Sequence, residues 1–151
     1  MILLIVSVLS FNWLAFRPNR VEGRQQTAHV WAFTMAFQLL FDLLFDFKFK
    51  GYWYFEKNSV DWTAFLARTL LIPPVNLLFL GFFPSERRFL AKAGYLAAWT
   101  AAILGYELLT MLPAPWGYFH YGWRNIGYSA VVDPILFFML LFYYRCFIQS
   151  R

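Results

Sequence analysis

The run TMAFQLLFDLLFD, residues 34–46, places polar side chains at regular intervals in an otherwise apolar segment. Thr34, Gln38, Asp42 and Asp46 are each four residues apart, so they line one face of an α-helix. In a membrane helix such a ridge faces the interior of a bundle or a wet cavity, because lipid cannot hydrogen-bond it. Asp46 also suits a position at the membrane surface, and Asp42 a structural hydrogen bond. The run predicts a transmembrane helix with one polar face.

The whole chain has the composition of a membrane protein. Of its 151 residues, 61% are hydrophobic and 14% are charged, whereas soluble domains average roughly 25% charged residues. Aromatic residues reach 23%, more than interfacial belts alone require, so many rings must face lipid or fill a core. We therefore predict that the lipid bilayer is the main partner of this chain.

Charge, cysteine and histidine usage exclude other classes. The formal net charge of +5 comes from Lys and Arg in short loops instead of a basic face, so no nucleic acid partner is predicted. Cys146 is the single cysteine, which excludes an intrachain disulfide and a cysteine-based metal cluster. His29 and His120 are distant in sequence, and no metal site is predicted from them. No motif assigns a cofactor.

Five apolar segments follow one another along the chain, at about 2–16, 28–46, 62–83, 89–112 and 127–147. At a rise of about 1.5 Å per residue, each of the last four crosses a hydrocarbon core of about 30 Å with some tilt. The first is short, which leaves the alternative of four spanning helices and one interfacial N-terminal helix. No linker or repeat divides the chain, so residues 1–151 are predicted to form one all-α transmembrane helical bundle of five helices.

The basic residues favour one orientation in the membrane. Eight share the side of the first loop, the third loop and the C-terminus: Arg17, Arg20, Arg24, Arg87, Arg88, Lys92, Arg145 and Arg151. Four lie on the other side: Lys48, Lys50, Lys57 and Arg124. By the positive-inside rule, this bias predicts a multi-pass protein of the plasma membrane with its N-terminus outside and its C-terminus in the cytoplasm.

Four ionisable side chains lie at membrane depth: Asp42, Arg68, Glu107 and Asp133. Each costs at least about 2.5–3.5 kcal/mol at the centre of a bilayer, so each needs a partner or a function. Arg68 is the natural counter-ion for one carboxylate, which leaves an excess of negative charge that protons or a bound cation must neutralise. The predicted ligand or cation site consists of these four residues together with Gln38 and Asn76.

Prolines mark two of the segments. Pro73 and Pro74 remove two backbone donors near the middle of segment 62–83, so a kink or break is expected there, with Asn76 just beyond it. Broken helices at membrane depth often mark binding sites, although proline kinks also occur without function. Asp133 precedes Pro134 and suits either an N-cap or an inward position on a kinked helix; a helix starting at Pro134 would be too short to span.

Segment 89–112 carries small residues on one side and polar residues on another. The small residues recur at four-residue spacing and predict surfaces for close helix packing, within the chain or between copies: Gly94, Ala98, Ala102 and Ala97, Ala101, Gly105. Thr100 and Thr110 each lie within about 60° of Glu107, on a largely different side of the helix. Glu107 is therefore expected to point into a cavity.

The loop 113–127 is dense in aromatic residues and glycine. Anchoring at the membrane surface by Trp and Tyr is one interpretation. The other is a re-entrant lid over the site, for which His120, Tyr121 and Trp123 are the candidate lid or gate residues.

The second half of the chain resembles a family of small polytopic integral membrane proteins from spore-forming Gram-positive bacteria. The residues that carry the resemblance include Phe83-Pro84, Tyr95, Trp99, Glu107, Gly117, Tyr121, Gly122-Trp123, Ser129, Asp133, Met139 and Tyr144. Asp42 and its apolar surroundings fit the same pattern, so that about two-thirds of the chain is covered. The resemblance implies a multi-helix membrane protein and implies no particular activity.

Three functions are compatible with these residues. The first is binding or transport of a cation, a proton or a small polar ligand, with the buried carboxylates as acceptors and Arg68 orienting them. The second is a structural role in a membrane complex, as a homo-oligomer or with a partner membrane protein. The third is an enzyme acting on a lipidic substrate, with Glu107 or Asp133 as acid or base. It ranks last because the sequence has no nucleophile motif, metal triad or phosphate loop.

Overall fold

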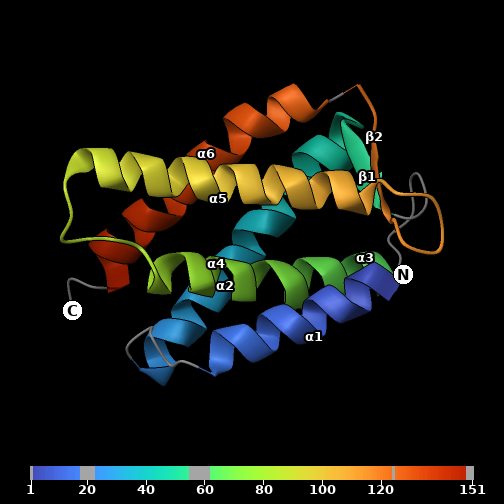
Figure 1. Cartoon of the computed structure of the whole chain (residues 1–151). Helices are drawn as coiled ribbons and strands as arrows, with labels where there is room; N and C mark the ends of the chain where they lie inside the picture. The colour runs from blue at the N-terminus through green and yellow to red at the C-terminus, as the bar shows by residue number, and fades with distance from the viewer. Residues whose placement is uncertain (1, 18–22, 55–61, 124, 149–151) are drawn as a thin grey trace.

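The computed structural model describes residues 2–17, 23–54, 62–123 and 125–148. Five helical segments run alternately in opposite directions between the two ends of the molecule (Figure 1). They are α1 (Ile2–Phe16), α2 (Arg24–Asp42) with the π-helical turn η1 (Leu43–Lys48), the helix Trp62–Gly81, α5 (Phe89–Thr110), and α6 (Ile126–Tyr143) with the π-helical turn η3 (Tyr144–Ile148). The predicted all-α bundle of five helices is confirmed.

Three of the described helices are long and apolar enough, by length and composition, to cross a membrane: Arg24–Phe45, Trp62–Gly81 and Ile126–Ile148. The structure is therefore consistent with a small multi-pass membrane protein. α5 was expected to join them and has the length, but Lys92, Glu107 and its Gly, Thr and Tyr residues dilute its apolar character. α1, with 15 residues, is the short apolar helix for which an interfacial position was the alternative.

The helix Trp62–Gly81 is the centre of the bundle. Most of its apolar stretch is buried, whereas the other two candidate spans expose most of theirs. It consists of α3 (Trp62–Leu66), the π-helical turn η2 (Ala67–Leu71) and α4 (Ile72–Gly81). α4 packs against α1 and α2, and η2 also contacts α1 and α2, while α5 packs mainly against α6. The molecule thus has two parts, with α5 and α6 on one side and α1 to α4 on the other.

The predicted break at Pro73 and Pro74 is absent. Both prolines are buried in the first turn of α4, and the chain stays helical from Trp62 to Gly81. The disturbance takes the form of the π-helical turn η2, which ends directly before Ile72. A π-helical turn shifts the hydrogen-bond spacing by one residue, so carbonyls that lose a proline donor can be accommodated without leaving the helix.

In the second proline region the helix begins well before Pro134, so of the two interpretations the inward position of Asp133 within a helix holds and the N-cap does not. α6 begins at Ile126, and its N-cap is Asn125, whose side chain accepts hydrogen bonds from the backbone N–H groups of Gly127 and Tyr128. Pro134 therefore lies inside α6, and Asp133 is not the N-cap. Asp133 is only 8% exposed and faces the interior of the bundle.

A two-stranded antiparallel ribbon closes one end of the bundle (Figure 1). It pairs β1 (Tyr52–Tyr54) with β2 (Phe119–Tyr121), and Tyr52 lies opposite Tyr121. Two glycines allow the chain to pass tightly on either side of β2. A Cβ atom on Gly117 would lie 1.8 Å from the Leu112 carbonyl oxygen, and one on Gly122 would lie 2.3 Å from the Lys50 carbonyl oxygen.

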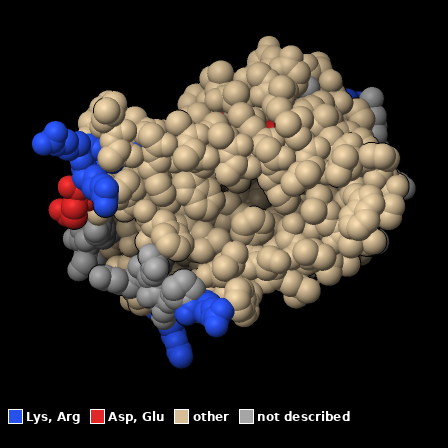
Figure 2. Space-filling model, viewed as in Figure 1, with Lys and Arg blue, Asp and Glu red and all other residues tan. Residues whose placement is uncertain are grey.

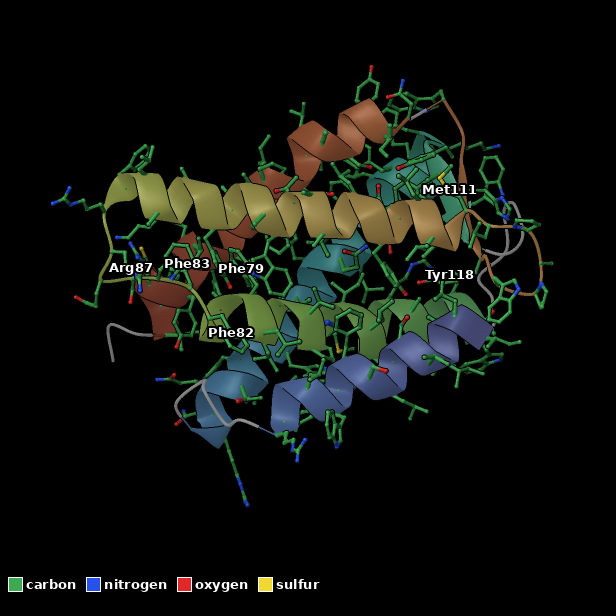
Figure 3. The ribbon with its side chains drawn as sticks, in the orientation of Figure 1. Phe79, Phe82, Phe83, Arg87, Met111 and Tyr118 are labelled. Atoms are coloured by element: carbon green, nitrogen blue, oxygen red, sulfur yellow. The ribbon has the colours of Figure 1, made fainter. Side chains whose placement is uncertain are left out.

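Two aromatic cores hold the bundle, one near each end. At the end away from the ribbon, Phe79 of α4 is fully buried; its ring centroid lies 4.3 Å from that of Phe137, and the Tyr95 hydroxyl donates to its carbonyl oxygen at 2.8 Å. At the ribbon end, Tyr118 and Phe119 pack with residues of α1, η1 and η2. Figure 3 shows Phe79 and Tyr118 well separated along the bundle, between α5 and α4.

The small residues of α5 do not mediate close packing within the chain. Gly94, Ala97, Ala101 and Gly105 are exposed, and a Cβ atom on either glycine would meet nothing within 4 Å. The expectation of an intrachain packing surface is therefore wrong for these residues, because α5 turns a different side toward α6. Two of the small residues, Ala98 and Ala102, border the internal cavity described below.

Charged residues are concentrated at the ends of the helices. Figure 2 shows them mainly at one end of the molecule, while the broad middle of that face is nearly free of charge. The C-terminal end of α1, the start of α2, the turn between α4 and α5, and the C-terminal end of η3 share one end in Figure 1, opposite the ribbon. Arg20, Lys57, Arg124, Arg151 and the side chain of Asp46 lie outside the described residues.

Candidate functional site

The bundle contains a partly open cavity of about 550 Å³ between its two parts. α1, α2, η2 and α4 form one wall, α5 and α6 form the other, and the ribbon contributes Tyr52 and Phe119. Most of the lining is aromatic or aliphatic. Glu107 of α5 and Asp133 of α6 are the acidic residues of the lining, and no Lys, Arg or His of the described chain is among its residues.

Asp42 and Arg68 form a buried ion pair beside this cavity. The Arg68 Nε atom lies 2.5 Å from Asp42 Oδ2, and the two residues are 4% and 2% exposed. Asp42 Oδ1 accepts hydrogen bonds from the Tyr52 hydroxyl and from Gln38 Nε2, the latter at 3.0 Å. A buried pair of this kind is tolerated only when both charges are balanced and further hydrogen-bonded. Asp42 and Arg68 thus balance each other's charge.

A second polar contact joins the same face of α2 to the helix Trp62–Gly81, about two helical turns from the ion pair. Asn76 Nδ2 donates to Thr34 Oγ1 at 3.1 Å, as Arg68 pairs with Asp42. The two contacts are eight residues apart on each helix. Residue numbers rise from Thr34 to Asp42 on α2 and fall from Asn76 to Arg68 on the partner helix, as expected for antiparallel helices. Thr34 and Asp42 of the predicted polar ridge therefore contact the helix Trp62–Gly81, and Gln38 contacts Asp42, whereas the side chain of Asp46 lies outside the described residues.

Glu107 is the centre of a second polar group, on the other wall. The Tyr121 hydroxyl donates to Glu107 Oε2 at 2.6 Å, and the Ser129 hydroxyl donates to Oε1 at 3.2 Å. Tyr121 comes from the ribbon and Ser129 from α6, so three elements converge on this carboxylate. Ser129 is fully buried, and Glu107 is half-buried at the edge of the cavity.

Asp133 lies one helical turn after Ser129 on α6, on the face of that helix that is turned inward. It lines the same cavity as Glu107 and is more deeply buried. Asp42, Glu107 and Asp133 were predicted to act as one set of acceptors. The structure instead sorts them, since Asp42 belongs to the ion pair and the other two belong to the cavity.

The ribbon connects the two polar groups. Tyr52 and Tyr121 are partners across the strands, and their hydroxyls donate to Asp42 and Glu107 respectively. Sequence reasoning missed Tyr52, because this residue lies between the apolar segments 28–46 and 62–83, where no element was predicted. The available signal was weak: Tyr52-Trp53-Tyr54 has the aromatic composition of a strand but is only three residues long.

The three candidate lid residues have separate positions. Tyr121 points inward to Glu107. His120 is exposed and stacks on Trp53 with a centroid distance of 6.0 Å, on the outer face of the ribbon. Trp123 is exposed, and its Nε1 atom donates to the Phe49 carbonyl oxygen at 2.6 Å. Of these three residues, only Tyr121 contacts a carboxylate that lines the cavity.

Metal binding by a cluster of side chains finds no support in the described residues, where no group of three or more His, Cys, Asp or Glu is placed to hold an ion. No protein family, curated protein or solved structure matches this chain. The family resemblance noted in the sequence therefore stays a prediction, and the function has to be argued from the geometry.

Proposed function

We propose that this chain is a membrane-embedded binding protein whose cavity takes up a cationic ligand, with Glu107 and Asp133 as acceptors. The observation that carries the proposal is the negative charge of the cavity lining: two carboxylates line the cavity, and no basic residue of the described chain does. Asp42 adds no charge to this count, because Arg68 balances it.

The apolar walls raise the free-energy cost of this negative charge. Aromatic and aliphatic side chains make up most of the walls around the two carboxylates. A carboxylate in such surroundings is costly unless a proton or a cation neutralises it. The Tyr121 and Ser129 hydroxyls orient Glu107 without neutralising it. A bound cation would balance the negative charge that Glu107 and Asp133 bring to the lining.

Binding is the part of the predicted function that the geometry favours over transport. Transport would need a part of the chain that moves, and the helix is continuous at Pro73 and Pro74, where a kink or break was expected. Any movement of a ligand across the membrane would need another hinge. We propose further that all five helices cross the bilayer, with the N-terminus outside, because the basic helix ends gather at one end of the bundle.

The test is ligand-dependent stability. Thermal unfolding of the purified protein in detergent is followed at several pH values with a panel of inorganic and organic ammonium cations. A ligand that binds the folded state at a hundred times its Kd stabilises it by about 2.7 kcal/mol. Glu107→Gln combined with Asp133→Asn is expected to abolish the gain, and Glu86→Gln, in the exposed turn before α5, is the matched control. A gain that survives the double substitution would contradict the proposal.

A structural role in a membrane complex is the second candidate, and one observation favours it. The exposed small residues of α5 leave open space along the outside of the bundle, where a neighbouring membrane helix could approach closely. Gly94→Leu would then reduce association, measured by crosslinking in membranes, without lowering the melting temperature of the monomer. Unchanged association in Gly94→Leu would remove this candidate.

A further inference from the structure

We infer that the ligand of this cavity is an organic cation with an apolar body, and that it enters from the lipid bilayer. This inference rests on the proposed function and specifies its ligand class. It follows from three properties of the cavity: its size, the chemistry of its walls and the side on which it opens.

The size of the cavity does not suit a bare metal ion. Its volume of about 550 Å³ falls within the range of about 300–1,000 Å³ that is typical of sites for drug-sized molecules. A calcium ion needs six to eight oxygen ligands at about 2.3–2.6 Å, and a magnesium ion needs an octahedral set. The walls are too apolar to supply such a shell, and the described residues contain no cluster of three metal-ligating side chains.

The walls suit an organic cation because they are rich in aromatic rings. Tyr95, Trp99 and Tyr106 of α5 lie on one side, Phe37 of α2 and Phe137 of α6 add further rings, and Tyr118 lies beside the ribbon. The face of an aromatic ring attracts an ammonium or similar cation, and the attraction grows when water is excluded. The carboxylates of Glu107 and Asp133 would then fix the charged end of the ligand, while the rings hold its apolar body.

The cavity opens on an apolar side of the molecule. α5 packs on α6 and is linked to the other wall mainly by aromatic side chains, such as the edge-to-face pair of Phe11 and Tyr106 with centroids 6.2 Å apart. Figure 2 shows the surface hollowed between α5 and α4, on a face that is nearly free of charged residues. In a membrane this face lies against lipid, so a ligand that partitions into the bilayer can reach the cavity directly.

The experiment uses two probes of nearly equal size and shape and opposite charge, tetraphenylphosphonium and tetraphenylborate. Binding of each is measured by equilibrium dialysis against the purified full chain in detergent, with protein-free detergent micelles as the blank. We expect saturable binding of tetraphenylphosphonium and at least about tenfold weaker binding of tetraphenylborate, because the charge of the cavity discriminates between them. Glu107→Gln with Asp133→Asn should remove this preference, and Glu86→Gln should keep it.

The outcomes separate the inference from the proposed function. If sodium, potassium or protons stabilise the protein through Glu107 and Asp133 but tetraphenylphosphonium does not bind, the inference is overturned and the proposed function stands. If both probes bind equally, the cavity does not discriminate by charge, and the inference and the proposed function are both overturned. Retained preference in the double variant would also overturn both. Trp99→Leu provides a second check, because losing a ring from the wall should weaken tetraphenylphosphonium binding while leaving the charge preference intact.

Discussion

Asp42 and Arg68 show how a charged residue in a membrane helix can be structural. Both are almost fully buried, they contact each other, and Tyr52 and Gln38 complete the hydrogen bonding of the carboxylate. Glu107 and Asp133, by contrast, line a cavity without a basic residue among its described lining. At the scale of single residues, these surroundings distinguish the structural pair, Asp42 and Arg68, from the carboxylates of the candidate site.

The first prediction concerns this ion pair. Asp42→Asn leaves the guanidinium of Arg68 buried without its counter-charge, and breaking a buried pair in this way costs about 3–5 kcal/mol. We expect a large drop in the melting temperature of the purified protein, measured in detergent. Adding Arg68→Met removes the stranded charge and should recover most of the loss. If the double variant is as unstable as the single one, the pair is not the reason for the loss.

A second prediction uses the two tyrosines that face each other across the ribbon. Tyr52→Phe and Tyr121→Phe each remove one hydroxyl donor, and each is expected to cost about 1 kcal/mol of stability. Only Tyr121→Phe should also weaken cation binding, since only Tyr121 orients Glu107. Binding isotherms of the two variants are compared with that of the unsubstituted chain. Equal weakening by both would argue against a separate role for Glu107.

The ribbon is the element on which both polar groups depend, and glycine permits its close contact with the end of α5. We predict that Gly117→Ala strongly destabilises the protein, because the added Cβ atom would lie 1.8 Å from the Leu112 carbonyl oxygen. Gly105→Ala is the control: its Cβ atom meets nothing within 4 Å, and alanine in a helix interior is favoured over glycine by about 0.5–1 kcal/mol. Equal melting temperatures for the two variants would contradict this account of the ribbon.

The helices were predictable from sequence to a greater degree than their connections. Long apolar runs fix where helices form, so the predicted segments 2–16 and 62–83 match α1 (Ile2–Phe16) and the helix Trp62–Gly81 closely. The two strands are three residues each and are held by partners nearly seventy residues away, which leaves no local periodicity to read. The tolerance of Pro73 and Pro74 likewise depends on η2, a turn with no recognisable sequence signal.

At the scale of the whole molecule, the sequence identified the ionisable residues and not their pairing. Which carboxylate Arg68 balances depends on the register between two antiparallel helices, and that register is set by packing over their whole length. The small residues of α5 show the same limit. Their spacing predicts a surface for close packing, but only the position of α6 shows that this surface faces outward.

The orientation in the membrane gives a further prediction at this scale. Cys146 is the only cysteine of the chain and is exposed near the C-terminal end of the bundle, so it reports on the side of that end. A membrane-impermeant maleimide should label it in permeabilised cells and not in intact ones. His120→Cys in a Cys146→Ser background places the thiol on the exposed ribbon at the opposite end and should show the reverse. Labelling of Cys146 in intact cells would mean that the orientation is inverted.

The central claim is that the negative charges of Glu107 and Asp133 serve ligand binding and are not required for the stability of the bundle. The most direct measurement is the melting temperature of the variant Glu107→Gln with Asp133→Asn, purified without added cation, beside that of Asp42→Asn. The amides keep the shapes of the carboxylates and remove the buried charge of Asp133 and the half-buried charge of Glu107. This double variant should therefore be at least as stable as the unsubstituted protein, while Asp42→Asn is much less stable. A loss in the double variant as large as that of Asp42→Asn would show that the cavity carboxylates are structural and would contradict the account.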